Sequence, residues 1–248
     1  MAHDPIQVLQ GARRQAALPR KPVLLVAGAT GVLGNEVVRR LSGSGRFAST
    51  QVLAREPMRT GLRGVEPTCV DSDAPAAWPV AGHVDVAVVM FDPPRLFYDR
   101  ERALWTPRPE QLPALAQWLR TSGATTLAVV LPHAQGRLPE ALKRGLASLD
   151  EQAVAALGFE RLLIIRSAQK PREPGAAGFG DRVARFMLSG VKYMVPSSEQ
   201  PVRAARVAQL VAAALEIAPH GIHIAAPELV WRAAQGELRA VAAEWLQR

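Results

Sequence analysis

Three glycines at three-residue spacing point most directly to a chemical role in this chain. Gly28, Gly31 and Gly34 follow a short apolar run and precede a helical pattern. A strand, a glycine-rich turn and a helix form the start of a dinucleotide-binding unit. We expect Gly28 to allow a sharp turn, Gly31 to let a pyrophosphate approach the backbone, and Gly34 to let the helix pack closely. The helix N-terminus then offers N–H groups and a positive dipole end to phosphates. The alternative is an ordinary strand–helix turn whose glycines serve packing alone.

Apolar runs of strand length recur along the chain and indicate the elements that must position this turn. The run at 23–27 is typical of a strand buried on both faces. Further strands are expected at 47–54, 64–70, 84–91, 125–131, 161–166, 193–195 and 221–225. Helices are expected after the glycine turn, with Val37, Val38 and Leu41 on one side, and at 112–119, 183–188, 201–217 and within 228–245.

The alternation of strands and helices predicts an α/β fold, a doubly wound and mostly parallel sheet of the Rossmann type. We expect a small C-terminal cap on this sheet. Residues 1–20 are predicted to be an N-terminal extension. Residues 21–248 are predicted to form a single NAD(P)-binding domain, with substrate-side elements from about residue 167.

The sequence Gly-Ala-Thr-Gly-Val-Leu-Gly at 28–34 resembles the cofactor turn of atypical short-chain dehydrogenase/reductase proteins. These include NmrA-like redox sensors, Tat-interacting-protein-like oxidoreductases and sugar-nucleotide epimerase relatives. The resemblance extends from about residue 22 to the C-terminus, and its first part is the specific one. It implies that a dinucleotide is bound by Gly28, Thr30, Gly31, Val32, Leu33 and Gly34.

Arg55, directly after the second predicted strand, bears on the choice of dinucleotide. At this place an acidic residue binds the ribose 2′-hydroxyl of NAD, whereas an arginine accommodates the 2′-phosphate of NADP. Arg59 lies close behind, and Glu56 comes one residue late. We therefore expect NADP, with NAD as the alternative. An exposed surface arginine without this role is the other interpretation.

The ends of the third and fourth strands supply further candidate cofactor contacts. Asp71 follows the third strand, where the resemblance implies an aspartate near the adenine; a loop aspartate or a helix cap is the equal alternative. Met90 and Phe91 end the fourth strand, and ligands of open α/β sheets bind outside the carboxyl ends of the strands. These two side chains either line the pocket or pack in the core.

The catalytic pair of the family is missing from this chain. Catalytic relatives carry Tyr-x-x-x-Lys, in which the tyrosine transfers a proton to the substrate carbonyl and the lysine lowers its pKa. The corresponding positions fall at about Lys143 and Ala147, and the sequence contains no Tyr-x-x-x-Lys. His133 is a weak candidate for an acid or base there, although a hydrogen-bonded loop histidine is the more common role.

Two more residues match the family's pattern near the second half of the sheet. Glu151 corresponds to a common helix glutamate, and Arg166 corresponds to an arginine at the end of the sixth strand. His220 and His223 have no accompanying carboxylate or cysteine cluster, so we predict no metal site.

The composition limits the classes of function. The formal net charge is +8 and the pI is about 10.7, which suits an anionic ligand such as a dinucleotide. The arginines are scattered without interleaved aromatic residues, so we do not expect nucleic-acid binding. No apolar run is long enough to span a membrane, and the N-terminus has no secretory pattern. One cysteine, Cys69, fits the reducing cytoplasm, and we expect it to be a buried small hydrophobe.

Three functions are compatible with these features. The first is an NAD(P)-binding protein that senses the redox state of the cofactor and reports it to a protein partner. The second is an NADPH-dependent oxidoreductase with a non-standard proton donor. The third is a ligand-free interaction module. The glycines and Arg55 argue against the third, and the missing Tyr-x-x-x-Lys argues against the ordinary form of the second.

Overall fold

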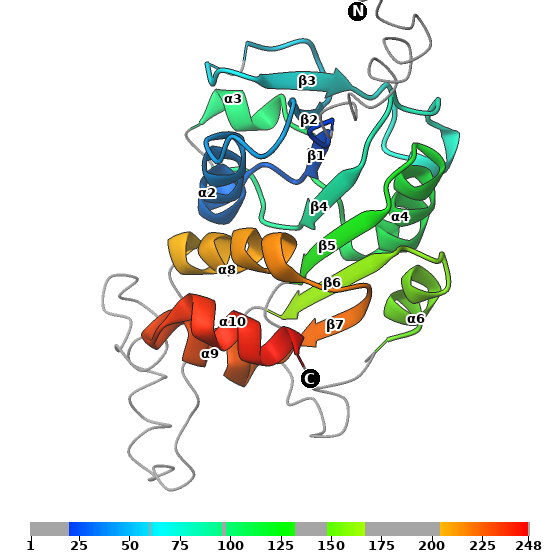
Figure 1. Cartoon of the computed structure of the whole chain (residues 1–248). Helices are drawn as coiled ribbons and strands as arrows, with labels where there is room; N and C mark the ends of the chain where they lie inside the picture. The colour runs from blue at the N-terminus through cyan, green and yellow to red at the C-terminus, as the bar shows by residue number, and fades with distance from the viewer. Residues whose placement is uncertain (1–19, 60, 96–97, 132–147, 167–203, 248) are drawn as a thin grey trace, which may run out of the picture.

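A seven-stranded sheet is the centre of the computed structural model, which describes residues 20–59, 61–95, 98–131, 148–166 and 204–247 (Figure 1). Its strand order is β3-β2-β1-β4-β5-β6-β7, and all six pairings are parallel. The strands are β1 Leu24–Ala27, β2 Thr50–Ala54, β3 Val65–Cys69, β4 Val86–Met90, β5 Thr126–Leu131, β6 Arg161–Arg166 and β7 Gly221–Ala225. The order reverses between β1 and β4, which is the topological switch point of a doubly wound sheet. The predicted fold class is confirmed.

Helices cover both faces of the sheet (Figure 1). One face carries α2 Gly31–Ser42, α8 Ala204–Ile217, α9 Pro227–Gln235 and α10 Leu238–Leu246, and the other carries α4 Leu112–Thr121 and α6 Leu149–Ala155. Shorter elements are the 3₁₀ turns η1 Pro75–Ala77 and η2 Pro109–Gln111 and the one-turn helix α3 Asp99–Arg102. No helix among the described residues has the length and apolarity needed to cross a membrane.

Strand β1 shows why a continuous apolar run forms the centre of the sheet. Leu24 and Val26 pack with α2 and α8, whereas Leu25 and Ala27 pack with α4 on the opposite face. Successive strand residues point to opposite faces, so a strand covered on both sides needs apolar side chains throughout.

Helix α2 turns one apolar side to the sheet, as its sequence pattern predicts. Val37, Val38 and Leu41 are buried, and α8 lies alongside α2 on the same face (Figure 1). The N-terminal end of α2 therefore lies at the carboxyl end of β1, and its C-terminal end lies next to α8.

Within the described residues, the strand predictions hold except at some boundaries and for one side chain. The second strand begins at Thr50 rather than residue 47, because its pairing with β1 starts where Thr50 meets Leu24. The expected burial of Cys69 is wrong: this thiol is exposed, because it ends the edge strand β3. The predicted strand 221–225 is confirmed, and 228–245 contains two helices. The predictions at 183–188 and 193–195 lie outside the described residues.

Candidate functional site

The glycine turn between β1 and α2 adopts a conformation that needs its glycines. Gly28 and Gly31 have φ angles of 75° and 68°, in the left-handed region that side chains disfavour. A Cβ on Gly28 would lie 2.0 Å from the Met90 carbonyl oxygen, and one on Gly34 would lie 2.6 Å from the Ala29 carbonyl carbon. Gly28 and Gly34 thus allow close contacts within the chain itself.

Gly31 faces acidic side chains of a distant segment. Its N–H donates to Glu101 Oε2 at 3.0 Å, and a Cβ on Gly31 would lie 2.9 Å from Asp92 Cβ. The N–H groups in the first turn of a helix have no partner within the helix. In α2, a carboxylate 70 residues further along the chain supplies such a partner.

Glu101 is buried and accepts four hydrogen bonds. The donors are Gly31 N–H, Asn35 Nδ2, and both the backbone N–H and Nε of Arg95, at 2.7–3.0 Å. Burial by itself opposes ionisation, but these hydrogen bonds outweigh it and hold the pKa of Glu101 below its ordinary value. The N-terminus of α2 therefore holds a buried anion where a dinucleotide-binding fold holds a phosphate.

A second carboxyl group lies beside the first. The Leu33 N–H donates to the Asp92 carboxyl group, and the Thr30 hydroxyl donates to the Asp92 carbonyl oxygen. Burial raises the pKa of Asp92, and the hydrogen bond from Leu33 offsets part of that rise. Gly31 and Leu33, two of the predicted cofactor contacts, thus both donate to acidic side chains.

The acidic residues belong to one stretch, residues 92–95 and 98–107, which we call the covering segment. Its inner part is fixed to the sheet through Trp105, which has no exposed surface. Trp105 N–H donates to Leu53 O, Gly28 N–H donates to Trp105 O, and Trp105 Nε1 donates to Asp73. The Trp105 ring also meets Trp78 edge-on, with ring centroids 4.8 Å apart.

The outer part of the covering segment lies at the surface. It contains the one-turn helix α3 and Tyr98, which is 51% exposed. The Arg95 guanidinium lies 3.6 Å from the centre of the Tyr98 ring and forms an ion pair with Glu101. The segment is therefore anchored in the core at Trp105 and reaches the glycine turn through a short surface helix.

Arg55 and Asp71 line a shared hollow of about 390 Å³ beyond the ends of β2 and β3. Arg55 Nη1 forms an ion pair with Asp73 at 2.8 Å, and both side chains are about half exposed. Trp78 and Trp118 form an apolar wall of the same hollow. The structure therefore brings these two predicted residues together and gives Arg55 an acidic partner.

The remaining predicted contacts differ in their surroundings. Met90 is buried in the core on the α2 face, and it faces Gly28 through its carbonyl oxygen. Phe91 is half-buried against the opposite face, and Val32 is 58% exposed. For Met90 the structure supports the packing interpretation. His133, Lys143 and Ala147 lie outside the described residues.

Sequence reasoning missed Asp92, Glu101 and Trp105. Asp92 is the second residue after the end of β4, and that position was a signal for a site residue. Nothing in the local pattern around Glu101 indicates a contact with Gly31.

A buried ion pair lies at the carboxyl end of β6. Arg166 Nη2 is 2.8 Å from Glu151 Oε2, and both side chains are almost completely buried. The pair connects β6 to α6 and joins the two residues that match the family's pattern in this half of the chain.

No family model and no curated protein matches the sequence. Solved structures do resemble the chain. A Rossmann-fold NAD(P)-binding family protein from Shigella flexneri is 16% identical, with 62% of this chain and 71% of that chain covered and a TM-score of 0.39. MoeE5 in complex with UDP-glucuronic acid and NAD is 16% identical, covers 88% and 82%, and has a TM-score of 0.48.

The enzyme WbmH from Bordetella bronchiseptica in complex with NAD⁺ is 13% identical to the chain, with coverages of 86% and 81% and a TM-score of 0.42. At these values the likeness concerns the fold alone. The doubly wound arrangement of this chain rests on its own strand order and on the helices that cover both faces of the sheet.

Proposed function

We propose that this chain is an NAD(P)-binding regulatory protein in which the dinucleotide and the covering segment compete for the glycine turn. One observation carries the proposal: the Gly31 N–H at the N-terminus of α2 already binds an anion, the Glu101 carboxylate. A helix N-terminus accepts a phosphate for the same reason that it accepts a carboxylate. In this proposal, the backbone of the turn accepts a pyrophosphate once Glu101 and Asp92 withdraw.

The covering segment can withdraw without leaving a lone charge in the protein. Arg95 and Glu101 form an ion pair on the same short stretch, so both charges leave together. Trp105 keeps the inner part in place, and residues 92–95 together with the one-turn helix α3 form the moving part, because Asp92 also lies against Gly31. Because the binding-competent state is a fraction of the population, the apparent affinity for dinucleotide is reduced by that fraction.

The other candidate contacts have defined tasks in this proposal. Gly31 and Leu33 hold the pyrophosphate through their N–H groups, and Asp71 lies near the adenine. Arg55 binds the 2′-phosphate of NADP after releasing Asp73. An exposed ion pair of this kind contributes about 0–1 kcal/mol, so its loss costs little. We therefore propose NADP rather than NAD as the preferred ligand.

The proposed output is a change of shape rather than turnover. A bound nicotinamide dinucleotide supplies hydride chemistry, and the protein must orient a substrate against it. The chain lacks the Tyr-x-x-x-Lys pair that relatives use for the proton. We propose that a cytoplasmic protein partner recognises the position of the covering segment instead.

A calorimetric titration of the wild-type protein with NADPH and NADH at fixed salt tests the proposal. We expect NADPH to bind more tightly than NADH. Amide hydrogen exchange in the same samples should become faster at residues 98–102 when NADPH is bound, because α3 leaves the turn. Absence of binding by either dinucleotide would overturn the proposal.

The burial of Trp105 favours a second candidate, a ligand-free interaction module. The covering segment pairs with β2 through backbone hydrogen bonds at Ala103 and Trp105. Contacts within the chain also account for Gly28, Gly31 and Gly34. On this candidate the segment is a permanent part of the fold, and hydrogen exchange at 98–102 stays unchanged with either dinucleotide.

A further inference from the structure

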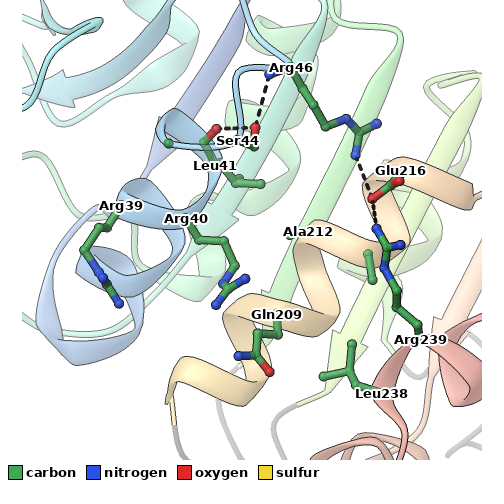
Figure 2. A pocket seen from close by; sticks show the side chains of 12 residues that line it. Arg39, Arg40, Leu41, Ser44, Arg46, Gln209, Ala212, Glu216, Leu238 and Arg239 are labelled. Atoms are coloured by element: carbon green, nitrogen blue, oxygen red, sulfur yellow. Dashed lines mark hydrogen bonds and ion pairs between the residues drawn. The ribbon is translucent and has the colours of Figure 1, made fainter.

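A second hollow lies at the opposite end of α2. It has a volume of about 560 Å³ and is enclosed by the end of α2 with the turn that follows, by α8 and by the start of α10 (Figure 2). Its volume falls within the range of small-molecule sites, about 300–1,000 Å³. It is separate from the glycine turn, which is at the N-terminal end of the same helix.

The hollow is lined by four arginines and one glutamate. Arg239 Nη2 lies 2.7 Å from Glu216 Oε2, and Arg46 Nη1 lies 3.7 Å from the same oxygen (Figure 2). One carboxylate therefore faces two guanidinium groups and neutralises one charge. Arg39 is paired with Glu36, which is outside the lining.

Among the arginines that line the hollow, Arg40 is the one whose charge is not paired with a carboxylate of the described residues. Among the described residues no hydrogen bond or ion pair involves its guanidinium, which points toward Gln209 (Figure 2). Arg206 donates to Gln209 Oε1 at 3.1 Å, which leaves the amide group of Gln209 as a donor. The helix dipole accounts for basic residues in the last turn of α2, but it does not account for Arg239 on the facing helix.

The apolar lining of the hollow is offered mainly by Ala212 and Leu238, which are partly exposed, whereas Leu41 and Ala213 are buried beneath it. An apolar floor with a cationic rim suits a ligand with a flat organic body and an anionic group. Guanidinium groups bind phosphate oxygens through paired N–H donors, which gives phosphate an advantage over other anions.

We infer that this hollow binds an organic phosphate of nucleotide size. The phosphate lies between Arg40 and Arg239, with the Gln209 amide as a further donor. The body of the ligand covers Ala212 and Leu238, the partly exposed apolar residues of the lining. Glu216 competes with the phosphate for Arg46 and Arg239, so it lowers the affinity and holds the site together when no ligand is bound.

The probes for the test are AMP and inorganic phosphate, observed through the arginine Nε–H signals in NMR spectra at fixed ionic strength. We expect AMP to shift the signals of Arg40 and Arg239, and to bind more tightly than inorganic phosphate because it covers the apolar floor. Arg40→Gln should weaken AMP binding about tenfold. The matched variant Arg63→Gln removes the same charge from an exposed loop and should change AMP binding less than twofold.

Glu216→Gln should change AMP affinity in the opposite direction to Arg40→Gln, because it removes the competing carboxylate. We expect AMP to bind several-fold more tightly to this variant, and Glu110→Gln is its control. An equal loss of AMP affinity in Arg40→Gln and Arg63→Gln would mean that AMP is attracted by net charge alone, and it would overturn the inference. Binding of polyglutamate without binding of AMP would overturn it as well. These outcomes are independent of the dinucleotide titration, because they are observed at arginines of the hollow.

Discussion

The two ends of α2 differ in how their hydrogen-bonding and charged groups are paired. At the N-terminal end, Gly31 and Leu33 donate to two acidic side chains that come from elsewhere in the same chain. At the C-terminal end, four arginines share a hollow with one carboxylate, and Arg40 has no partner among the described residues. The motif indicates an anion site at the first end, but the unbalanced charge lies at the second.

This difference shows what a glycine turn alone can establish. Buried backbone N–H groups require partners, and the covering segment supplies them from within the protein. A dinucleotide must therefore replace existing hydrogen bonds at the N-terminal end. A ligand at the C-terminal end would instead add bonds to a guanidinium that lacks them.

The largest expected effect on stability comes from adding a side chain at the glycine turn before α2. Gly28→Ala places a Cβ 2.0 Å from the Met90 carbonyl oxygen at a φ of 75°. We expect the free energy of unfolding to fall by about 3 kcal/mol or more in urea denaturation. Gly45→Ala is the control, because Gly45 has a φ of 67° but no heavy atom within 4 Å of its added Cβ. Equal losses would mean that backbone strain, and not the close contact, is responsible.

Removing one carboxylate from each end compares the two sites directly. Glu101→Ala leaves the Gly31 N–H without its partner, and Asn35 keeps only the Gly31 carbonyl oxygen as an acceptor, so we expect a loss of about 2–3 kcal/mol. Glu216→Ala removes exposed ion pairs and should cost about 0–1 kcal/mol. Urea denaturation measures both losses. Similar losses at the two ends would contradict the contrast between a buried and an exposed carboxylate.

The ionisation of Glu101 should contribute to the pH dependence of the free energy of unfolding. Its pKa is lowered in the folded state, so its contribution is complete above the unfolded value of about 4.3 and is lost as the pH falls below that value. The raised pKa of Asp92 acts in the opposite direction. We expect Glu101→Gln to flatten the acid-induced loss in urea denaturation between neutral pH and pH of about 3. An unchanged slope would mean that Glu101 is not the group responsible.

The smallest expected effect concerns Arg55. Arg55→Ala should weaken NADPH binding about fivefold and leave NADH binding almost unchanged, because only NADPH carries the 2′-phosphate. Calorimetry of both ligands measures this, and Arg63→Ala controls for general charge. Equal weakening of the two ligands would remove Arg55 as the 2′-phosphate contact.

The sheet and the glycine turn follow from local sequence patterns. The apolar run of β1 and the buried side of α2 were predictable because their periodicity lies within a dozen residues. Strand β7 was predictable for the same reason. The exposure of Cys69 was not predictable in this way. It depends on β3 being the edge of the sheet, which is a property of the whole topology.

The covering segment depends on contacts between distant parts of the chain. The hydrogen bond between Gly31 and Glu101 spans 70 residues, and the ion pair of Arg55 with Asp73 joins two different loops. A sequence pattern names residues that suit phosphate, but it does not say whether another part of the chain already binds to them. The same limit applies to the hollow at the other end of α2, which residues of three helices enclose.

The central claim is that the Glu101 carboxylate and a dinucleotide compete for one site. It is tested most directly by measuring NADPH affinity in the wild-type protein, Glu101→Gln and the control Glu110→Gln. Glutamine keeps an acceptor for Gly31 but removes the charge that pairs with Arg95. We predict about tenfold tighter NADPH binding in Glu101→Gln and no change in Glu110→Gln. Equal NADPH affinity in all three proteins would contradict the claim.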